Sequence, residues 1–588
     1  MRHLDCARRV DAVALPGYAL ALALLVVGPL LGRGYLLLRD AVSTPRSYLS
    51  DDALGLMSAP RATPQDFAVA LASHLLDGGV VVKALLVLAL WLAGWGAARL
   101  VATVVPDAGR GGQLVAITLA IWNPYVAERL LQGHWSLLLG YGCLPWVATT
   151  MLTLRSTTAR WPRFWGLAFW IAVAGLTATG LILAATVALV CAAALGAGRP
   201  RRWCAAVALG AAAAAALPWL TALALGPSVP AHNWAAGSGV AAFAARAEPG
   251  LGTLGSLASL GGIWNAEAVP GSRTTLFVIV AAIALLGVVA AGLPGVLHRP
   301  AAMPLLMLAV PAVLVPAALA TGPGLGVLRA AVTAVPGLGV LRDGQKWVAL
   351  AMPGYTLAAA GTVLTARRWL PCAATAGACC IALIATLPDL ACGEWGKITP
   401  VRYPVGWTAV AATINRSPGP VAVLPAGTIR RFSWSGPAPV LDPLPRWVRA
   451  DVLITGDLII SGRTVPGENS RARAVQELLL RGSDPHTLSR AGVAWLVVET
   501  GSVGEKGLAE RVLDKLPVVY RDGDLELYYI GGQATVPSGR RVAVLIAHLA
   551  WLALLTGGLR VALSAWRCRR DTQRCDATGD RLRFKSRR

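Results

Sequence analysis

The chain has 588 residues, of which 56% are hydrophobic and only 14% are charged. Because an average soluble protein is about a quarter charged, this composition excludes a purely soluble protein. The formal net charge of +23 does not indicate a nucleic-acid binder, because the basic excess lies beside apolar runs of about 20 residues, the length that spans a hydrocarbon core. We therefore expect a polytopic membrane protein that contacts the lipid bilayer and no nucleic acid.

Apolar runs separated by charged turns predict an all-α membrane bundle of about twelve spans. The third run is short, and Pro124 should end or bend it. The predicted spans lie at 13–38, 80–104, 113–125, 136–154, 164–178, 181–198, 203–223, 273–297, 303–321, 346–366, 369–388 and 541–563.

Basic residues between the spans predict the orientation. If both termini are cytoplasmic, Arg155, Arg199, Arg299 and Arg367 all lie in cytoplasmic turns, as the positive-inside rule requires. We therefore expect a multi-pass protein of the plasma membrane. Its basic cytoplasmic tail is 564–588. From 567 to 588 the tail has almost no apolar residues and should be disordered.

The same reading divides the chain into parts. Residues 1–388 form a multi-span membrane domain with a first external loop at 39–79, and 389–540 form an extracytoplasmic soluble α/β domain before the last span, 541–563. In the soluble domain, β-branched runs alternate with amphipathic stretches. These patterns predict strands at 421–424, 452–460, 495–498 and 525–530, and helices at 470–481 and 505–516.

Three carboxylates of the first external loop are candidates for acid–base chemistry. Asp40 directly follows the first predicted span. A partly desolvated carboxylate there can act as general base toward a sugar hydroxyl, but Asp40 could also be a helix-end charge paired with Arg39. Asp51 and Asp52 are adjacent, so on a helix they would point about 100° apart and could not form a dyad. Their alternative role is to cap a helix.

Two further segments carry cations at the predicted outer rim. The segment 123–135 contains Arg129 and His134, which could bind an anionic head group, although an interfacial aromatic belt is the alternative. Before the tenth span, Arg342 and Lys346 stand four residues apart, which would place them on one helical face. That arrangement suits a phosphate, but both side chains could instead be snorkelling to the interface.

The spans themselves contain few ionisable residues, among them Lys83 at the outer end of the second span and Arg560 near the inner end of the last. Ion-coupled transporters keep such residues inside the membrane, so the pattern favours a reaction at the external face. The sequence has no zinc or Walker motif. It predicts no cofactor, although it leaves room for a single divalent cation.

At these residues the chain resembles a known group. Asp40 directly after the first span, the Asn-Pro-Tyr-Val-Ala-Glu-Arg-Leu-Leu segment at 123–131 and the Arg-Asp-Gly-Gln-Lys motif at 342–346 resemble large integral membrane proteins of actinobacterial envelopes. That group is similar to GT-C glycosyltransferases, which use polyprenyl-phosphate-linked sugars and carry a catalytic carboxylate in the first external loop. The resemblance covers most of the membrane part. Residues 491–498 and the closing hairpin are similar to soluble domains appended to such enzymes.

One departure from the group affects the choice of base. The acidic pair often expected in that loop is not formed at Asp40, because its preceding neighbour is Arg39. The base implied by the resemblance is therefore Asp40, Asp51 or Asp52.

Two functions follow as hypotheses. The first is an inverting glycosyltransferase that moves a sugar from a polyprenyl-phosphate donor to an envelope glycan or glycolipid at the outer face. In this hypothesis Asp40 is the base, and the departing phosphate is bound by Arg129, His134, Arg342 and Lys346. The second is a non-catalytic membrane transporter or scaffold for envelope lipid and glycan assembly, which should tolerate the loss of Asp40.

Overall fold

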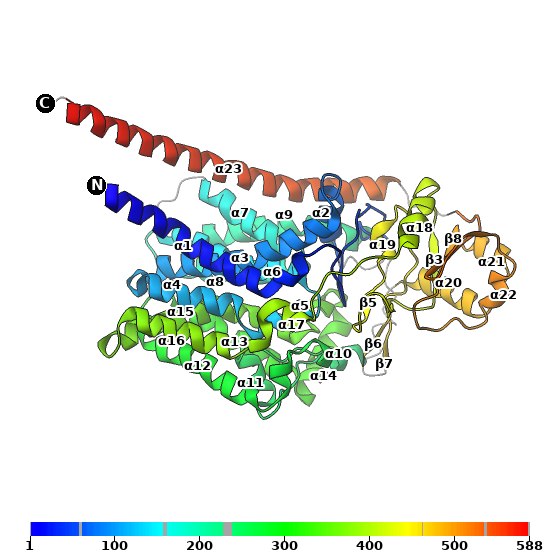
Figure 1. Cartoon of the computed structure of the whole chain (residues 1–588), viewed down its shortest axis with the longest axis horizontal. Helices are drawn as coiled ribbons and strands as arrows, with labels where there is room; N and C mark the ends of the chain where they lie inside the picture. The colour runs from blue at the N-terminus through cyan, green and yellow to red at the C-terminus, as the bar shows by residue number, and fades with distance from the viewer. Residues whose placement is uncertain are drawn as a thin grey trace.

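The computed structural model describes residues 2–57, 62–156, 162–226, 238–460, 463–467, 469–533 and 538–585. Helices form a bundle, and a four-stranded sheet lies at one end of it (Figure 1). Both ends of the described chain lie at the opposite end of the bundle (Figure 1). The predicted fold class, a polytopic helical bundle with an α/β part, is confirmed.

Each of the twelve predicted runs contains an apolar helix. Within the described ranges, eight helices are long and apolar enough to cross a membrane, or up to ten if two bent pairs are each counted as one span. The pairs bend by 94° and 78°, and two further helices are shorter than a span. The count is below twelve because the predicted spans 164–178 and 181–198 form the two shorter helices, which the Thr177 cap separates. The Thr321 hydroxyl caps the second helix of the first bent pair.

The long helices of the bundle are α1 (Arg2–Val27), α3 (Gly78–Val104), α4 (Gly109–Ile121), α6 (Trp135–Ser156), α7 (Pro162–Ala174), α8 (Ala178–Ala192), α9 (Arg201–Leu225), α12 (Phe277–Val296), α13 (Met303–Leu319), α14 (Gly322–Ala334), α15 (Met352–Thr365), α16 (Cys372–Ala385) and α23 (Ser538–Lys585). Shorter helices are α2 (Gln65–Ala72), α5 (Pro124–Leu131), α10 (Ser238–Ala242), α11 (Gly252–Ala258) and α17 (Ala391–Gly396).

The last helix, α23, packs along α7 and α9 and then runs past the bundle (Figure 1). It stays helical to Lys585, so the prediction of a disordered tail is wrong over 567–585. Extending an existing helix is far easier than starting one, and the last span supplies the start.

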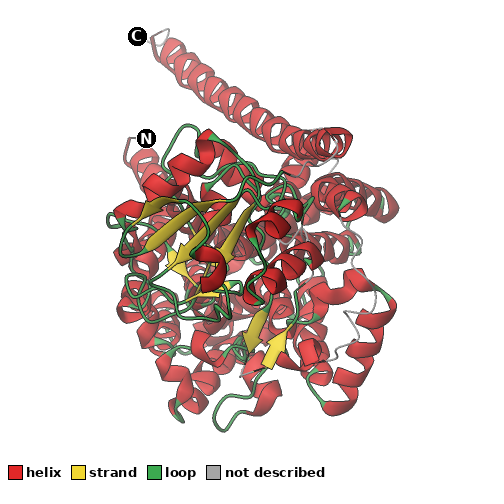
Figure 2. Cartoon of the chain, turned by 90° about the vertical axis from the view of Figure 1, so that its right-hand side faces the viewer, coloured by secondary structure: helices red, strands yellow, loops and turns green. Residues whose placement is uncertain are grey.

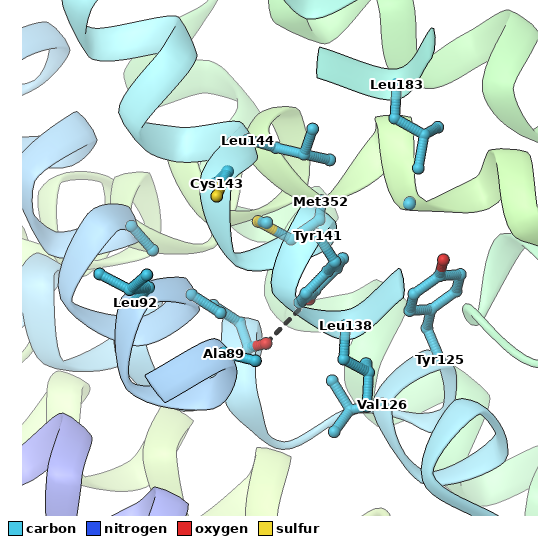
Figure 3. Packing of buried hydrophobic residues seen from close by; sticks show 14 of the residues in the cluster. Ala89, Leu92, Tyr125, Val126, Leu138, Tyr141, Cys143, Leu144, Leu183 and Met352 are labelled. Carbon is cyan, nitrogen blue, oxygen red and sulfur yellow. Dashed lines mark hydrogen bonds between the residues drawn. The ribbon is translucent and has the colours of Figure 1, made fainter. Parts of the chain in front are cut away.

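The short helix α5 is held in the middle of the bundle core. Its N-cap is Asn123, whose side-chain oxygen accepts from the Val126 N–H at 3.1 Å. The Asn123 amide donates to the Tyr141 hydroxyl on α6 at 3.1 Å, and the rings of Tyr125 and Tyr141 stack with centroids 5.2 Å apart. Figure 3 shows these rings among aliphatic side chains such as Leu138. The residues at the end of α5 are therefore rigidly positioned.

The sheet domain, residues 405–529, has the strand order β3 (Val421–Leu424), β8 (Trp495–Glu499), β10 (Leu525–Tyr529) and β9 (Val518–Arg521). β3 and β8 are parallel, and the other pairs are antiparallel. Helices pack against the sheet (Figure 2): α18 (Val405–Arg416) on one face, and α20 (Ser470–Leu480), α21 (Pro485–Arg490) and α22 (Glu510–Leu513) on the other.

The strands predicted around β3, β8 and β10 are confirmed, as is the helix predicted at 470–481. Two predictions differ. Only Leu458–Ile460 (β6) of the run at 452–460 is a strand, paired with β7 (Arg463–Val465), because Gly456 takes a φ of 79°. Of the helix predicted at 505–516, only α22 forms.

A hairpin after the first span joins the bundle to the sheet domain. Its strands are β1 (Leu37–Leu38) and β2 (Ala41–Val42). Alternate residues of a strand face opposite sides: Leu37 enters the core of the sheet domain, while Leu38 enters the core of the bundle. The hairpin also lies beside β5 (Val440–Leu441), which pairs with β4 (Ile429–Arg430).

The first span therefore ends earlier than predicted. α1 stops at Val27 and a short 3-10 turn follows to Leu31, because Gly32 and Gly34 interrupt the helix, the latter with a φ of 127°. The Lys83 ammonium donates to the carbonyl oxygens of both glycines at 2.7 Å. The Lys83 ammonium thus satisfies two carbonyl oxygens that the interrupted helix leaves without an intrahelical partner.

Candidate active site

Asp40 lies in the two-residue turn of the β1–β2 hairpin rather than at a helix end. Arg39, the other turn residue, has a φ of 49°. The turn packs against Gly133, where an added Cβ would lie only 2.4 Å from the backbone of Leu38 and Ala41. Gly133 also has a φ of 84°, so both space and conformation require glycine there. This close approach brings the hairpin to the end of α5.

The Asp40 carboxylate is held by two side chains from the segment after α5. Its Oδ2 atom lies 2.8 Å from His134 Nε2 and accepts from Gln132 Nε2 at 3.1 Å. The Asp40 side chain is 36% exposed and that of His134 is 16% exposed. The carboxylate is thus fixed in position and still reachable from outside the protein.

The contacts of the two groups determine their charge. Burial alone would raise the pKa of Asp40, but the hydrogen bond and charge of His134, helped by Gln132 and Lys346, lower it below its ordinary value. Burial lowers the pKa of His134 despite the neighbouring Asp40, and Lys346 and Arg129 act in the same direction. At neutral pH, Asp40 is therefore a carboxylate and His134 is neutral.

The hydrogen bonds assign the tautomer of His134. Its Nδ1 atom lies 3.1 Å from Nη1 of Arg129, and a guanidinium can only donate. Nδ1 is therefore the acceptor, and the ring proton is on Nε2, where it points at the Asp40 carboxylate.

Arg129 does not have the setting that the sequence predicts. Its side chain is fully buried. Nη1 and Nη2 donate to the two carboxylate oxygens of Asp343 at 2.7 and 2.9 Å, and Nη2 also donates to Gln345. The guanidinium has no exposed surface at which an external phosphate could contact it in this structure. Instead it connects Asp343 to His134.

Lys346 is the more accessible cation beside this pair. Its ammonium lies 3.7 Å from Asp343 Oδ2, and its side chain is 24% exposed. Arg342 lies over the ring of Phe243, 5.4 Å from the centroid. The two do not share one α-helical face as predicted, because Asp343 has extended backbone between two 3-10 turns, 336–341 and 344–351.

Asp51 and Asp52 have other partners. Asp51 Oδ1 lies 3.2 Å from Nε of Arg541, near the start of α23. The backbone N–H of Asp52 donates to Asp451 of the sheet domain at 3.0 Å. Of the three candidate carboxylates, it is Asp40 that the structure brings together with His134 and Lys346.

A polar layer behind the site contains residues that the sequence analysis did not single out. Glu128 is buried and accepts from the N–H groups of Gly262 and Ile263, both at 3.1 Å, and from Gln345 at 3.0 Å. Asp343 and Gln345 lie inside the 342–346 motif, and Gln132 is next to Gly133. These residues lie close in the sequence to the predicted cations, and that proximity is the feature of the sequence that indicates them.

No group of three or more His, Cys, Asp or Glu side chains in the described parts of the chain is placed to hold a metal ion.

Comparisons with known proteins add a likeness in fold. No family model matches the chain, and no curated protein sequence matches it. Two cryo-EM structures of the arabinofuranosyltransferase AftD from mycobacteria, one of them a mutant, align with 88% of this chain at 17% and 18% identity, with TM-scores of 0.56 and 0.54. The chain spans 40% and 41% of their lengths. It therefore shares its fold with this mycobacterial arabinofuranosyltransferase, and the expected likeness to membrane glycosyltransferases is confirmed at the level of fold.

Proposed function

We propose that this protein transfers a sugar from a polyprenyl-phosphate donor to an envelope glycan or glycolipid at the outer face of the plasma membrane. The observation that carries the proposal is the Asp40 carboxylate, ionised and partly exposed, held by neutral His134 beside Lys346. With both termini cytoplasmic, as the basic turns indicate, this site and the sheet domain face outward.

In this mechanism Asp40 acts as general base. It takes the proton of an acceptor hydroxyl while the hydroxyl oxygen attacks the anomeric carbon of the donor. The bond from that carbon to the phosphate oxygen breaks, and the lipid phosphate leaves with the electron pair. Attack from the side opposite the phosphate inverts the configuration. Lys346, with Arg342 nearby, stabilises the charge that develops on the leaving phosphate.

Arg129 and His134 have a positioning role in this proposal instead of binding phosphate. The buried Asp343–Arg129 pair holds the imidazole through Nδ1, and the imidazole holds Asp40 through Nε2. A base held in one orientation needs no rearrangement at the moment of reaction.

The proposal is tested with the purified protein in vesicles, a radiolabelled polyprenyl-phosphate sugar and a soluble envelope oligosaccharide. An arabinofuranosyl donor is the first choice, because the two solved structures of the same fold are arabinofuranosyltransferases. We expect label to enter the oligosaccharide. Label that crosses the bilayer without entering glycan would instead favour a transporter.

Replacing Lys346 by alanine is expected to lower kcat by about 10²-fold, the effect of removing one group that stabilises transition-state charge. The Asp40–His134 contact should remain, because Lys346 is not hydrogen-bonded to either side chain. Steady-state kinetics with varied donor measure the effect. Lys515→Ala, at an exposed position of the sheet domain, is the control. Equal rates in the two variants would rule out Lys346 as the leaving-group cation.

The pH dependence of transfer tests the role of His134. Because the pKa of Asp40 lies below its ordinary value, wild-type kcat/KM should change little above about pH 6.5, where His134 is neutral. In His134→Ala the hydrogen bond that lowers the pKa of Asp40 is lost, while burial still raises it. Asp40 then protonates at higher pH, so the acid limb of the profile should move upward. A limb that stays in place or moves down would contradict this role.

A further inference from the structure

A loop of the sheet domain lies directly beside the Asp40 hairpin. This loop, residues 431–439, connects β4 to β5. The Arg39 N–H donates to the Pro439 carbonyl at 2.9 Å, and the Leu441 N–H donates back to the Arg39 carbonyl at 2.9 Å. Ala438 packs against the core of the bundle. The sheet domain therefore contributes part of the rim around Asp40.

Glu267 faces this loop from the bundle side. Its Oε1 atom lies 3.8 Å from Nη2 of Arg431, and its Oε2 atom lies 3.9 Å from Nη2 of Arg39. The Glu267 and Arg431 side chains are 58% and 57% exposed, whereas Arg39 is buried. Arg39 is anchored independently, because it donates to the backbone carbonyls of Leu131 and Glu267 at 2.6 Å.

The segment that carries Glu267 is also linked to the base. Asn265, two residues earlier, donates to Gln132 Oε1 at 2.7 Å, and Gln132 donates to Asp40. Glu267 and Arg431 therefore lie on two segments that both contact the turn containing Asp40. An ion pair as exposed as that of Glu267 and Arg431 contributes little to stability. A contribution to folding stability therefore does not explain why a carboxylate and a guanidinium face each other here.

A third side chain of the loop suits a sugar ring. Trp434 is half-buried. It stacks on Phe432 with centroids 4.8 Å apart, and its ring also contacts Tyr403 and Trp407. Its indole is thus held rigidly by other rings while part of it remains exposed. A flat apolar surface with a polar edge is suited to a ligand that is apolar on one face and polar around its rim.

We propose that Glu267, Arg431 and Trp434 form a binding site for the acceptor glycan next to Asp40. The inference rests on the proposed function and names the ligand of this part of its site. A carboxylate accepts hydrogen bonds from sugar hydroxyls, a guanidinium donates to them, and the indole covers a ring face. The Glu267 carboxylate would repel a phosphate, so this side of Asp40 suits a neutral polyhydroxyl chain, whereas the Lys346 side suits the donor.

The kinetic test compares Glu267→Gln and Arg431→Ala with wild type. We expect each to raise the acceptor KM about tenfold, equivalent to one weakened interaction, and to leave the donor KM nearly unchanged. Glu267→Gln keeps the backbone carbonyl that holds Arg39, so the Asp40 turn should stay in place. Arg481→Ala is the matched control, because Arg481 forms an exposed ion pair with Glu477 on α20 of the same domain. An unchanged acceptor KM in both variants would overturn the proposal, and so would an equal rise in donor KM.

A binding test separates this inference from the proposed function. A short arabinan oligosaccharide is titrated against the full-length Asp40→Asn protein, which should bind glycan without turning it over, and the change in tryptophan fluorescence is followed. We expect saturable binding that weakens about tenfold when Glu267→Gln or Arg431→Ala is added. Binding that these changes do not affect would overturn the acceptor site, even if transfer is observed. Binding that they weaken in a protein with no transferase activity would support the glycan site and reject the proposed reaction.

Discussion

Replacing Asp40 by asparagine is expected to reduce sugar transfer by about 10²–10⁴-fold, the usual contribution of a general base. Asparagine keeps the size of the side chain and an oxygen that can accept from His134 and Gln132, so the hairpin turn should stay in place. The variant cannot take the proton of the acceptor hydroxyl. The measurement is the rate of label transfer from a radiolabelled polyprenyl-phosphate sugar into glycan, with thermal unfolding as a check on folding.

The other two carboxylates of the first loop serve as controls for this result. Asp51→Asn and Asp52→Asn should change the rate much less, because Asp51 pairs with Arg541 and Asp52 contacts Asp451 through its backbone. Full activity in Asp40→Asn with loss in Asp51→Asn would move the base to Asp51. Full activity in all three variants would show that none of these carboxylates is the base, whereas a wild-type protein that transfers no label into glycan would leave the transporter or scaffold in place of the transferase.

Replacing Asp343 by alanine is expected to destabilise the protein by about 3–5 kcal/mol, the cost of removing one partner of a buried ion pair. The substitution leaves the fully buried Arg129 guanidinium without its bidentate carboxylate. Transfer should also fall, since Arg129 would no longer hold His134. Thermal unfolding in detergent gives the stability, and the transfer assay gives the rate.

The matched control is Asp107→Ala. Asp107 lies 2.6 Å from Arg299, but this ion pair is at the surface. Exposed pairs contribute about 0–1 kcal/mol, so the control should unfold close to wild type. If Asp343→Ala and Asp107→Ala unfolded at the same temperature, the buried pair would not be holding the site.

The helices were predictable from the sequence because an apolar run of span length is a local property. The points at which helices are interrupted were harder to predict. The second helix of the first bent pair, for example, begins at a cap that depends on the single hydroxyl of Thr321. The end of the first span was also predicted wrongly. The apolar residues Leu36 and Leu38 were expected to continue the membrane helix, whereas the structure buries them in and beside a β-hairpin.

Four of the residues that the sequence singles out, Asp40, Arg129, His134 and Lys346, lie together in the structure. The sequence could not predict which of them face outside, because a charge pattern carries no information on partners distant in the chain. Arg129 was therefore predicted to bind phosphate, although in the structure its guanidinium forms a buried ion pair with Asp343. The contact between Asp40 and His134 depends on a hairpin turn that the sequence analysis missed.

The hairpin that carries Asp40 also constrains how the protein is made. During translation the Asp40 turn is synthesised early, but the carbonyl of Pro439 and the N–H of Leu441, which hold its neighbour Arg39, emerge roughly 400 residues later. Leu37 likewise has no core to enter until the sheet domain has folded. The carboxylate therefore reaches its final position only after the sheet domain has been synthesised. A nascent chain that stalls in the middle of the bundle is left with an incomplete site.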